Sequence, residues 1–220
     1  MKRNAMLLGA VVLSMFAGVA SASVVSKDLG TAVPPVSVGP YFMNKFDQTA
    51  QPANGTSVAS IPGFAGGTSV GTSPNATKQT IGAGWATWSN GYTGAVFVYT
   101  GTTATLTLPA GSHAFYLYAE PQQFQNFNIT VTPSVGAPIS VTVNGQGGAN
   151  GYAFYTTANE TLNTVKVTTA DPTGFAVGEF AINNGPAVFL DIPTLDPAML
   201  IALAVLLLGA GAWMYRRNRA

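Results

Sequence analysis

The sequence feature that most constrains the fold is a period-two alternation of apolar and polar residues in the second half of the chain. Ala104, Leu106 and Leu108 alternate with threonines in residues 103–108, and residues 126–132 and 139–143 repeat the pattern. Successive side chains of a β-strand point to opposite faces of a sheet, so this alternation is typical of strands with one buried face. The sequence therefore predicts short strands, separated by glycine- and proline-containing turns.

Other segments of the same region are apolar without alternation. Residues 114–119 are apolar or aromatic at every position, which predicts a central strand. Residues 95–99 are a short apolar run that suits a buried strand, and residues 152–155, 165–167 and 175–182 complete the set of predicted strands. No interior stretch shows helical periodicity. We therefore predict an all-β ectodomain whose core, residues 91–190, is an antiparallel β-sandwich or jelly roll.

The stretch before this core, residues 23–90, is rich in Gly, Ser, Thr, Asn and Pro. Pro34, Pro35 and Pro40 predict an extended arm at its start, and residues 41–46 suit a first strand. Residues 50–80 predict long loops with short strands, although so long an irregular stretch is unusual inside a compact domain. We expect residues 23–90 to form an N-terminal arm and a loop-rich start of the ectodomain.

The N-terminus has the three parts of an export signal. Lys2 and Arg3 form a positive start, residues 5–19 are apolar, and Ala20-Ser21-Ala22 has the small residues that a signal peptidase needs. We interpret residues 1–22 as a signal peptide that is removed after Ala22. The alternative is an uncleaved signal anchor.

The C-terminus, residues 191–220, contains an uncharged apolar run at 198–215. A helix of about 18 residues is about 27 Å long, enough to cross a membrane. Trp213 and Tyr215 end the run at a position that suits the membrane interface. Arg216, Arg217 and Arg219 follow and predict a cytoplasmic end, with the preceding domain beyond the inner membrane. The alternative is a buried helix of a soluble domain.

A tetrapeptide, Ile192-Pro193-Thr194-Leu195, precedes this run. Together with the apolar run and the arginines, it resembles the IPTL-CTERM sorting domain, a relative of the PEP-CTERM signals of Gram-negative bacteria. The resemblance implies processing by an exosortase-type transpeptidase, removal of the helix and transfer to the cell surface. The tryptophan usual after the tetrapeptide is absent, because Asp196-Pro197-Ala198-Met199 occupies its place. A plain single-pass anchor is the alternative.

Residues 44–47 and 174–180 carry a looser likeness to domains found before PEP-CTERM-type tails. This likeness implies a β-sandwich and no particular chemistry.

The chain contains no cysteine, which excludes disulfides and thiolate metal sites. Its basic residues number nine, and five of them lie in the two terminal signals. Because no basic patch is left, the sequence does not favour a nucleic-acid partner.

Catalytic signatures are scarce, and we expect neither an enzyme nor a cofactor. Residues 67–71 match G-x-S-x-G, but this motif needs a strand–turn–helix elbow that an all-β chain does not offer. His113, the single histidine, has no evident carboxylate partner and suits a strand edge. A glycoside hydrolase would need two facing carboxylates, and the only glutamates are Glu120, Glu160 and Glu179.

Two weaker groups of residues remain. Asp47 and Glu179 lie near the first and last strands and could contribute to a calcium site, although two carboxylates fall short of the six to eight oxygens that calcium takes. Trp85, Trp88 and Tyr92 cluster in a glycine-rich stretch, where they would either stack on sugars or fill the core.

The sequence thus favours an exported structural or adhesive protein of the cell envelope or extracellular matrix. Its expected partners are the inner membrane, an exosortase-type enzyme and an exopolysaccharide. The alternative is a surface-displayed carbohydrate-binding module that uses the aromatic cluster at residues 85–92.

Overall fold

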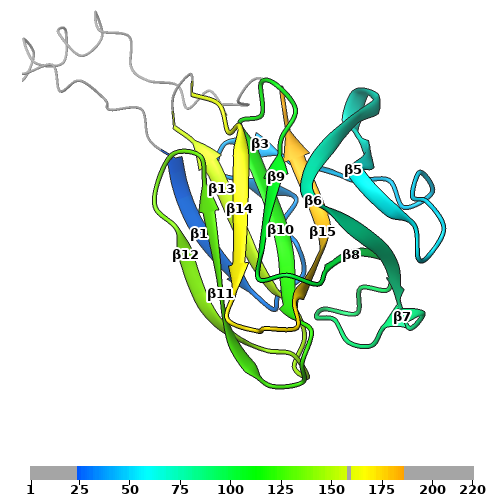
Figure 1. Ribbon diagram of the computed structural model, residues 1–220. Helices are drawn as coiled ribbons and strands as arrows, with labels where there is room; N and C mark the ends of the chain where they lie inside the picture. Colours follow the sequence, from blue (N-terminus) through cyan, green and yellow to red (C-terminus); the bar gives the residue numbers. More distant parts are fainter. Residues whose placement is uncertain (1–23, 158–159, 186–220) are drawn as a thin grey trace, which may run out of the picture.

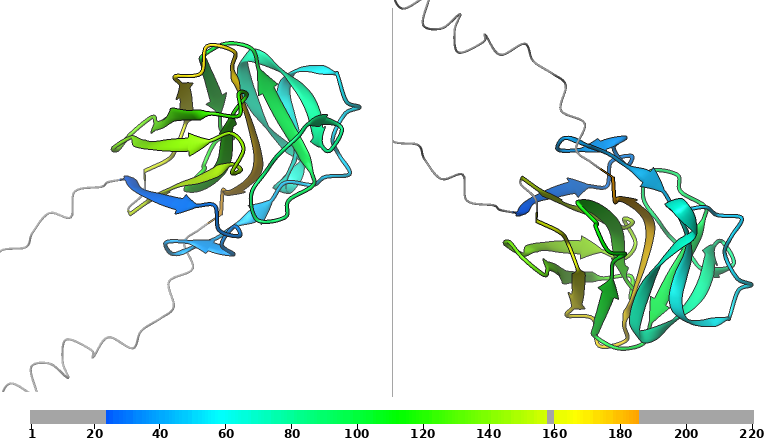
Figure 2. Two further views of the ribbon diagram at one scale, coloured as in Figure 1. Left: turned by 90° about the horizontal axis from the view of Figure 1, so that it is seen from below. Right: turned by 90° about the horizontal axis from the view of Figure 1, so that it is seen from above.

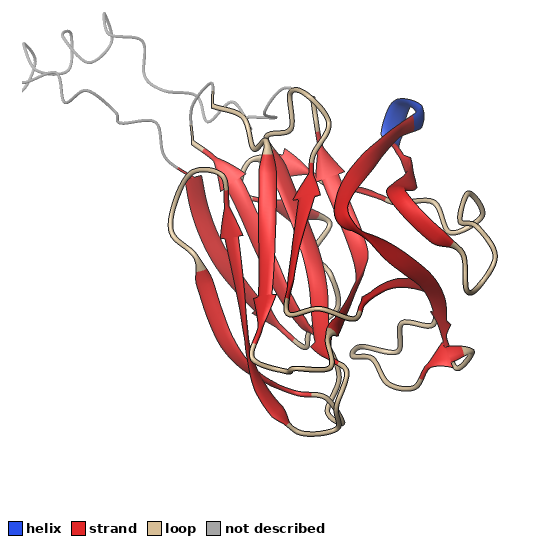
Figure 3. Ribbon diagram, viewed as in Figure 1, coloured by secondary structure: helices blue, strands red, loops and turns tan. Residues whose placement is uncertain are grey.

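The computed structural model describes residues 24–157 and 160–185. In this part of the chain β-strands dominate, and the one helical element is a short 3-10 turn, η1 (Ala65–Gly67), as Figure 3 shows. The longer strands are β1 (Val24–Gly30), β5 (Ser57–Phe64), β6 (Thr68–Ile81), β8 (Ala95–Tyr99), β9 (Thr103–Thr107), β10 (Ala114–Pro121), β11 (Asn126–Pro133), β12 (Ile139–Asn144), β13 (Asn150–Thr156), β14 (Thr164–Thr169) and β15 (Phe175–Asn183). Four two-residue strands complete the set: β2 (Ser37–Val38), β3 (Tyr41–Phe42), β4 (Asn44–Lys45) and β7 (Gly84–Trp85).

One sheet runs through most of these strands in the order β1-β13-β10-β15-β8-β6-β9-β14-β11-β12. Every pairing along this path is antiparallel. The sheet folds back on itself, so β12 at one end approaches β1 and β13 at the other (Figure 1). The result is a nearly closed sandwich of two layers, which confirms the predicted all-β antiparallel architecture.

Strand β6 makes the corner between the two layers. Its first half pairs with β9 through Gly71–Ser73, and its second half pairs with β8 through Thr77–Gln79. Strand β5 lies along its free edge. The expectation of long loops at residues 50–80 is therefore wrong for the stretch covered by β5 and β6. Threonine and serine suit exposed strands as well as loops, so only the pairing partners decide between the two.

The interior of the sandwich confirms the predicted alternation. Ala104, Leu106, Ile129 and Val131 are all fully buried, while the threonines between them are exposed or half-buried. These side chains meet the inward-facing residues of the opposite layer, such as Phe115 of β10, in one apolar core. Dense apolar packing of this kind is the main favourable contribution to folding.

Strand β10 is buried along its whole length, as predicted for a central strand. Its neighbours are β13 and β15. Tyr116 and Tyr118 lie on its outer face in a second apolar cluster, which Val38 and Tyr41 of the N-terminal arm cover. Figure 2 shows this arm crossing the outside of the sheet. The sequence predicted the arm as extended, and β1 at its start is a paired edge strand.

Several predicted features lie outside the described residues. They are the signal peptide at residues 1–22, the tetrapeptide at 192–195, the apolar run and the arginine cluster. Within residues 24–157 and 160–185, no helix has the length and apolarity needed to cross a membrane.

Candidate functional site

A tight turn at the end of β6 positions Trp85. The chain reverses at residues 80–83, where Ala83 N donates to Thr80 O at 2.9 Å, and Gly82 N donates to Trp85 O at 2.7 Å. Gly82 and Gly84 have φ of 81° and 104°, values that favour glycine. The turn brings Trp85 into β7, which pairs in parallel with the last two residues of β6.

The indole of Trp85 is fixed at one edge by a buried carboxylate. Its Nε1 donates to Glu120 Oε2 at 2.7 Å, and the Thr87 hydroxyl donates to Glu120 Oε1 at 2.8 Å. The same hydroxyl lies 3.0 Å from Gly145 O. Glu120 itself is fully buried at the end of β10. These contacts connect the segment after β7 to β10 and to the turn after β12.

Burial determines the electrostatics of Glu120. Loss of hydration disfavours the charged carboxylate and raises the pKa of Glu120 to about 7, although the hydrogen bonds from Trp85 and Thr87 oppose this shift. Neither partner carries a charge. The carboxyl group therefore changes its protonation state in the neutral pH range.

A second carboxylate anchors the other half of the same segment. Trp88 Nε1 and Asn90 Nδ2 donate to Glu179 Oε2 at 3.0 and 3.1 Å. Glu179 lies in β15, next to β10. Residues 85–90 are thus fastened to the outer face of these two central strands by donors to two different glutamates.

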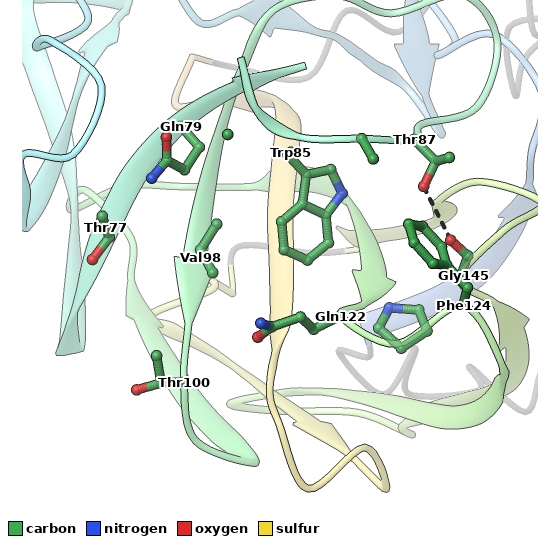
Figure 4. A pocket seen from close by; sticks show the side chains of 12 residues that line it. Thr77, Gln79, Trp85, Thr87, Val98, Thr100, Gln122, Phe124 and Gly145 are labelled. Carbon is green, nitrogen blue, oxygen red and sulfur yellow. Dashed lines mark hydrogen bonds between the residues drawn. The ribbon is translucent and has the colours of Figure 1, made fainter. Parts of the chain in front are cut away.

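Trp85 lines a pocket of about 410 Å³. Polar uncharged side chains make up much of its wall, including Gln79 of β6 and Gln122 of the turn between β10 and β11. Figure 4 shows the indole in the middle of these side chains. The complete lining is Thr77, Gln79, Gly84, Trp85, Ala86, Thr87, Val98, Thr100, Pro121, Gln122, Phe124 and Gly145. Among the described residues, no charged side chain belongs to this wall.

The turn that supplies Gln122 and Phe124 is held by Asp171. Gln123 donates to this carboxylate from its backbone N at 2.8 Å and from Nε2 at 2.9 Å. Thr173 donates to Asp171 Oδ1 from its backbone N and its hydroxyl. Burial alone would raise the pKa of Asp171, but these hydrogen bonds outweigh it and lower the pKa. The turn therefore holds Gln122 and Phe124 on a fixed support.

The structure separates Trp85 from Trp88 and Tyr92, whose rings pack on each other with centroids 6.0 Å apart. Trp85 lines the pocket, whereas Trp88 packs on the outer apolar cluster and Tyr92 packs on the core. The Tyr92 hydroxyl donates to Ala95 O at 2.8 Å. Sequence reasoning missed Gln79, Gln122 and Phe124, because no local pattern distinguishes a glutamine or an aromatic residue beside a pocket from any other.

The weaker catalytic candidates lie elsewhere. Ser69, the centre of the G-x-S-x-G match, is an exposed residue of β6 with no helix after it, so the elbow that the motif requires is missing. His113 stacks on the ring of Tyr41 with centroids 5.7 Å apart, and its Nδ1 lies 2.9 Å from the backbone oxygen of Glu160. These contacts are structural and include no carboxylate side chain.

Glu120 and Glu179 are neighbours in the sheet but do not face a common cavity. Glu120 pairs with Ala176, and Glu179 follows Ala176 by three residues, which places the two about 10 Å apart along the strand. Glycosidases hold two carboxylates on either side of the scissile bond in one cleft. Here, each carboxylate is instead turned to its own donors in residues 85–90.

Asp47 and Glu179, the candidate calcium ligands, have different partners. Phe46 N donates to Phe180 O at 3.2 Å, so the two segments are adjacent as predicted. The Asp47 carboxylate, however, accepts hydrogen bonds from Thr49 N and from the Thr49 hydroxyl, each at 2.8 Å. In the described part of the chain, no three acidic or histidine residues gather as a metal site would require.

No protein-family model matches the sequence. No curated protein matches it either. Among solved structures, a similar one is an exo-β-1,3-galactanase from Phanerochaete chrysosporium with β-1,3-galactotriose, at 19% identity over 59% of this chain and 29% of that chain, with a TM-score of 0.27. This chain thus spans under a third of the galactanase. TmCBM61 in complex with β-1,4-galactotriose has 13% identity over 53% of this chain and 87% of its own, with a TM-score of 0.24.

A family 29 carbohydrate-binding module, CBM29-2, is 11% identical over 81% of this chain and 99% of its own length, with a TM-score of 0.24. At these TM-scores the likenesses do not define a ligand site in this chain.

Proposed function

We propose that this protein is a surface-displayed carbohydrate-binding module, and that the pocket around Trp85 binds a neutral polysaccharide. The observation that supports this proposal most directly is the pocket wall, in which the described residues supply two aromatic side chains, two amides and three hydroxyls, and no charge. Aromatic rings offer an apolar face to the C–H groups of a sugar, and amides and hydroxyls match its hydroxyl groups.

The wall also indicates the kind of chain that would bind. An anionic polymer would need a basic partner, and no basic side chain of the described part of the chain lines the pocket. Phe124 is 58% exposed and Gln122 is exposed, so the pocket opens on one side beyond Trp85. An open site of this type accommodates a segment of a polymer, because the chain can continue into solvent on this side.

In this proposal, the two ends of the chain bring the protein to the cell surface. The signal peptide at 1–22 exports the protein, the apolar run at 198–215 holds the precursor in the inner membrane, and an exosortase-type enzyme transfers it to the cell surface. A neutral exopolysaccharide of the envelope or matrix is then the natural ligand. Binding would hold the polymer to the cell, so an adhesive role is compatible with the site.

The test is a glycan array followed by titration calorimetry with the purified full-length protein. We expect a neutral glycan to bind and Trp85→Ala to weaken its affinity more than tenfold, because the aromatic platform disappears. Trp85→Phe keeps a ring without the donor to Glu120 and should retain part of the affinity. Thermal unfolding of each variant identifies a loss that results from misfolding.

Two glutamines of the same turn test whether binding takes place in the pocket. Gln122 and Gln125 are both exposed residues of one turn, but only Gln122 lines the pocket. Gln122→Ala should weaken binding about twofold to tenfold, the value of one hydrogen bond, and Gln125→Ala should not. Absence of binding to any neutral glycan would reject the module and favour a purely structural role in the envelope.

A further inference from the structure

Glu179 occupies an unusual backbone position. Its φ is 52°, in the left-handed region that residues other than glycine rarely adopt. The register between β10 and β15 shifts at this point, between Tyr116 and Tyr118, which marks a β-bulge. Bulges redirect side chains and often lie beside functional sites, and strained residues persist where the surrounding structure holds them in place.

Only one of the two carboxylate oxygens of Glu179 accepts a hydrogen bond within the described residues. Trp88 and Asn90 both donate to Oε2, and no hydrogen bond within the described residues reaches Oε1. The residue is 9% exposed. Oε1 can therefore accept a hydrogen bond from a ligand.

Glu179 lines a hollow of about 160 Å³ that is distinct from the pocket around Trp85. We call it the Glu179 hollow. Its lining residues are Lys45, Phe46, Gln48, Tyr92, Tyr116, Glu179 and Phe180. The volume equals that of about five water molecules in the liquid, which is room for one small ring and not for a chain.

Two further polar groups of the hollow have no partner in the described residues. The hydroxyl of Tyr116 is buried without a hydrogen bond. Lys45 is exposed, and its ammonium group makes no hydrogen bond there. In contrast, the Tyr92 hydroxyl accepts from Gln48 and donates to Ala95 O, so it is already satisfied.

The opposite charges of Glu179 and Lys45 determine which kind of ligand suits the hollow. Burial raises the pKa of Glu179, whereas the donors Asn90 and Trp88 and the charge of Lys45 oppose the shift. A carboxylate only accepts hydrogen bonds and an ammonium group only donates them. A ligand anion would be repelled by Glu179, and a ligand cation would be repelled by Lys45. Two hydroxyls on neighbouring carbons satisfy both groups, because each hydroxyl donates and accepts.

We propose that the Glu179 hollow is a second binding site, which takes a single pyranose ring through a vicinal diol held between Glu179 Oε1 and the Lys45 ammonium group. Only the class of ligand rests on the proposed carbohydrate function. The rings of Phe46 and Phe180 form the apolar part of the wall. The site recognises a single ring, whereas the larger pocket around Trp85 accommodates a segment of a polymer.

The experiment is saturation-transfer NMR on the purified full-length protein with methyl pyranosides that differ in the configuration of their vicinal hydroxyls. We expect at least one glycoside to bind, and both Lys45→Gln and Glu179→Gln to weaken it about tenfold. Lys45→Gln is the sharper variant, because the Lys45 side chain holds no other element in place. Lys166→Gln, an exposed lysine of β14, should bind like the wild type.

Each other outcome decides against the proposal. Binding of a polysaccharide without binding of any single ring overturns this site and leaves the pocket around Trp85 intact. Absence of both overturns both proposals. A glycoside whose affinity is the same in Lys45→Gln and Glu179→Gln binds elsewhere, and preferential binding of a zwitterion such as glycine shows that the hollow does not recognise a diol.

Discussion

Trp85 and Glu120 lie on strands that do not pair, yet the indole Nε1 donates to the Glu120 carboxylate at 2.7 Å. This hydrogen bond fixes one edge of the only large aromatic residue of the 85–92 cluster that lines the pocket. Because Glu120 is fully buried, the position of the ring depends on a group whose charge is costly. The stability of the fold and the geometry of the pocket are therefore coupled at this contact.

The first prediction concerns pH. The pKa of Glu120 is raised to about 7 in the folded protein, so the folded state binds more protons than the unfolded state between about pH 4.5 and 7. Stability should therefore be highest below this window and fall as the pH rises through it. At about 1.4 kcal/mol per pH unit, this group accounts for up to about 3 kcal/mol. Denaturant unfolding at pH 5, 6, 7 and 8 measures the slope.

Glu120→Gln should flatten this pH dependence. The amide oxygen still accepts from Trp85, and the amide nitrogen can donate to Thr87, whose hydroxyl then donates to Gly145 O. A smaller slope of the same sign should remain, because burial also raises the pKa of Glu179. An unchanged slope in Glu120→Gln would show that Glu120 does not titrate in this range.

The second prediction concerns Gly84. An alanine Cβ at this position would collide with the side-chain amide of Gln79, and the φ of 104° adds backbone strain. We expect Gly84→Ala to lose about 1 to 2 kcal/mol from the strain and to push Gln79 out of the pocket, which weakens glycan binding. Chemical denaturation and titration calorimetry measure the two effects.

Gly82→Ala is the matched control for this experiment. Gly82 has φ of 81°, but a Cβ there meets no atom within 4 Å. It should lose a similar stability and keep the wild-type affinity. Equal affinities in both variants would mean that Gln79 does not contact the ligand.

The third prediction concerns the support of the pocket rim. Asp171→Asn replaces one acceptor of the Gln123 and Thr173 hydrogen bonds by a donor, in a fully buried site. We expect a loss of about 2 to 4 kcal/mol, and weaker glycan binding because Gln122 and Phe124 lose their support. Because the pKa of Asp171 is lowered, its contribution to stability is present above about pH 4 and is lost in acid.

Asp47→Asn provides the comparison for this variant. Asp47 accepts from the backbone N and the hydroxyl of Thr49, just as Asp171 accepts from Thr173, but Asp47 is exposed. Its replacement should shift the unfolding midpoint much less. Similar shifts in both variants would show that burial and the Gln123 hydrogen bonds add nothing.

The fourth prediction concerns the tail, which lies outside the described residues. Pro193 and Pro197 lack an N–H and favour extended conformations before them, which a protease cleft accepts. We expect cleavage near Ile192-Pro193-Thr194-Leu195 in the native host, and a surface form that lacks residues 198–220. Replacing Pro193 and Thr194 by alanine should leave export intact and trap the protein in the inner membrane. Intact-mass measurement decides, since a surface form that retains residues 198–220 would make the tail an ordinary anchor.

The sequence alone determined the strands with a strong local pattern. The threonine alternation around Leu106 and the continuous apolar run of β10 predicted two strands that the structure confirms. Such patterns are readable because the alternation of side chains between two faces is a property of each strand by itself. Residues 57–81 lack such a pattern. Only pairing makes β5 and β6 strands, β5 with β6 and β6 with β8 and β9.

Only the tertiary structure decided which aromatic residue reaches the pocket. Trp85 and Trp88 are three positions apart, and both donate to a glutamate, but one lines the pocket and the other packs under the arm. Their partners, Glu120 and Glu179, are 35 and 91 positions away. Burial and the pKa of a carboxylate depend on which distant segments cover it, and no local pattern of residues carries that information.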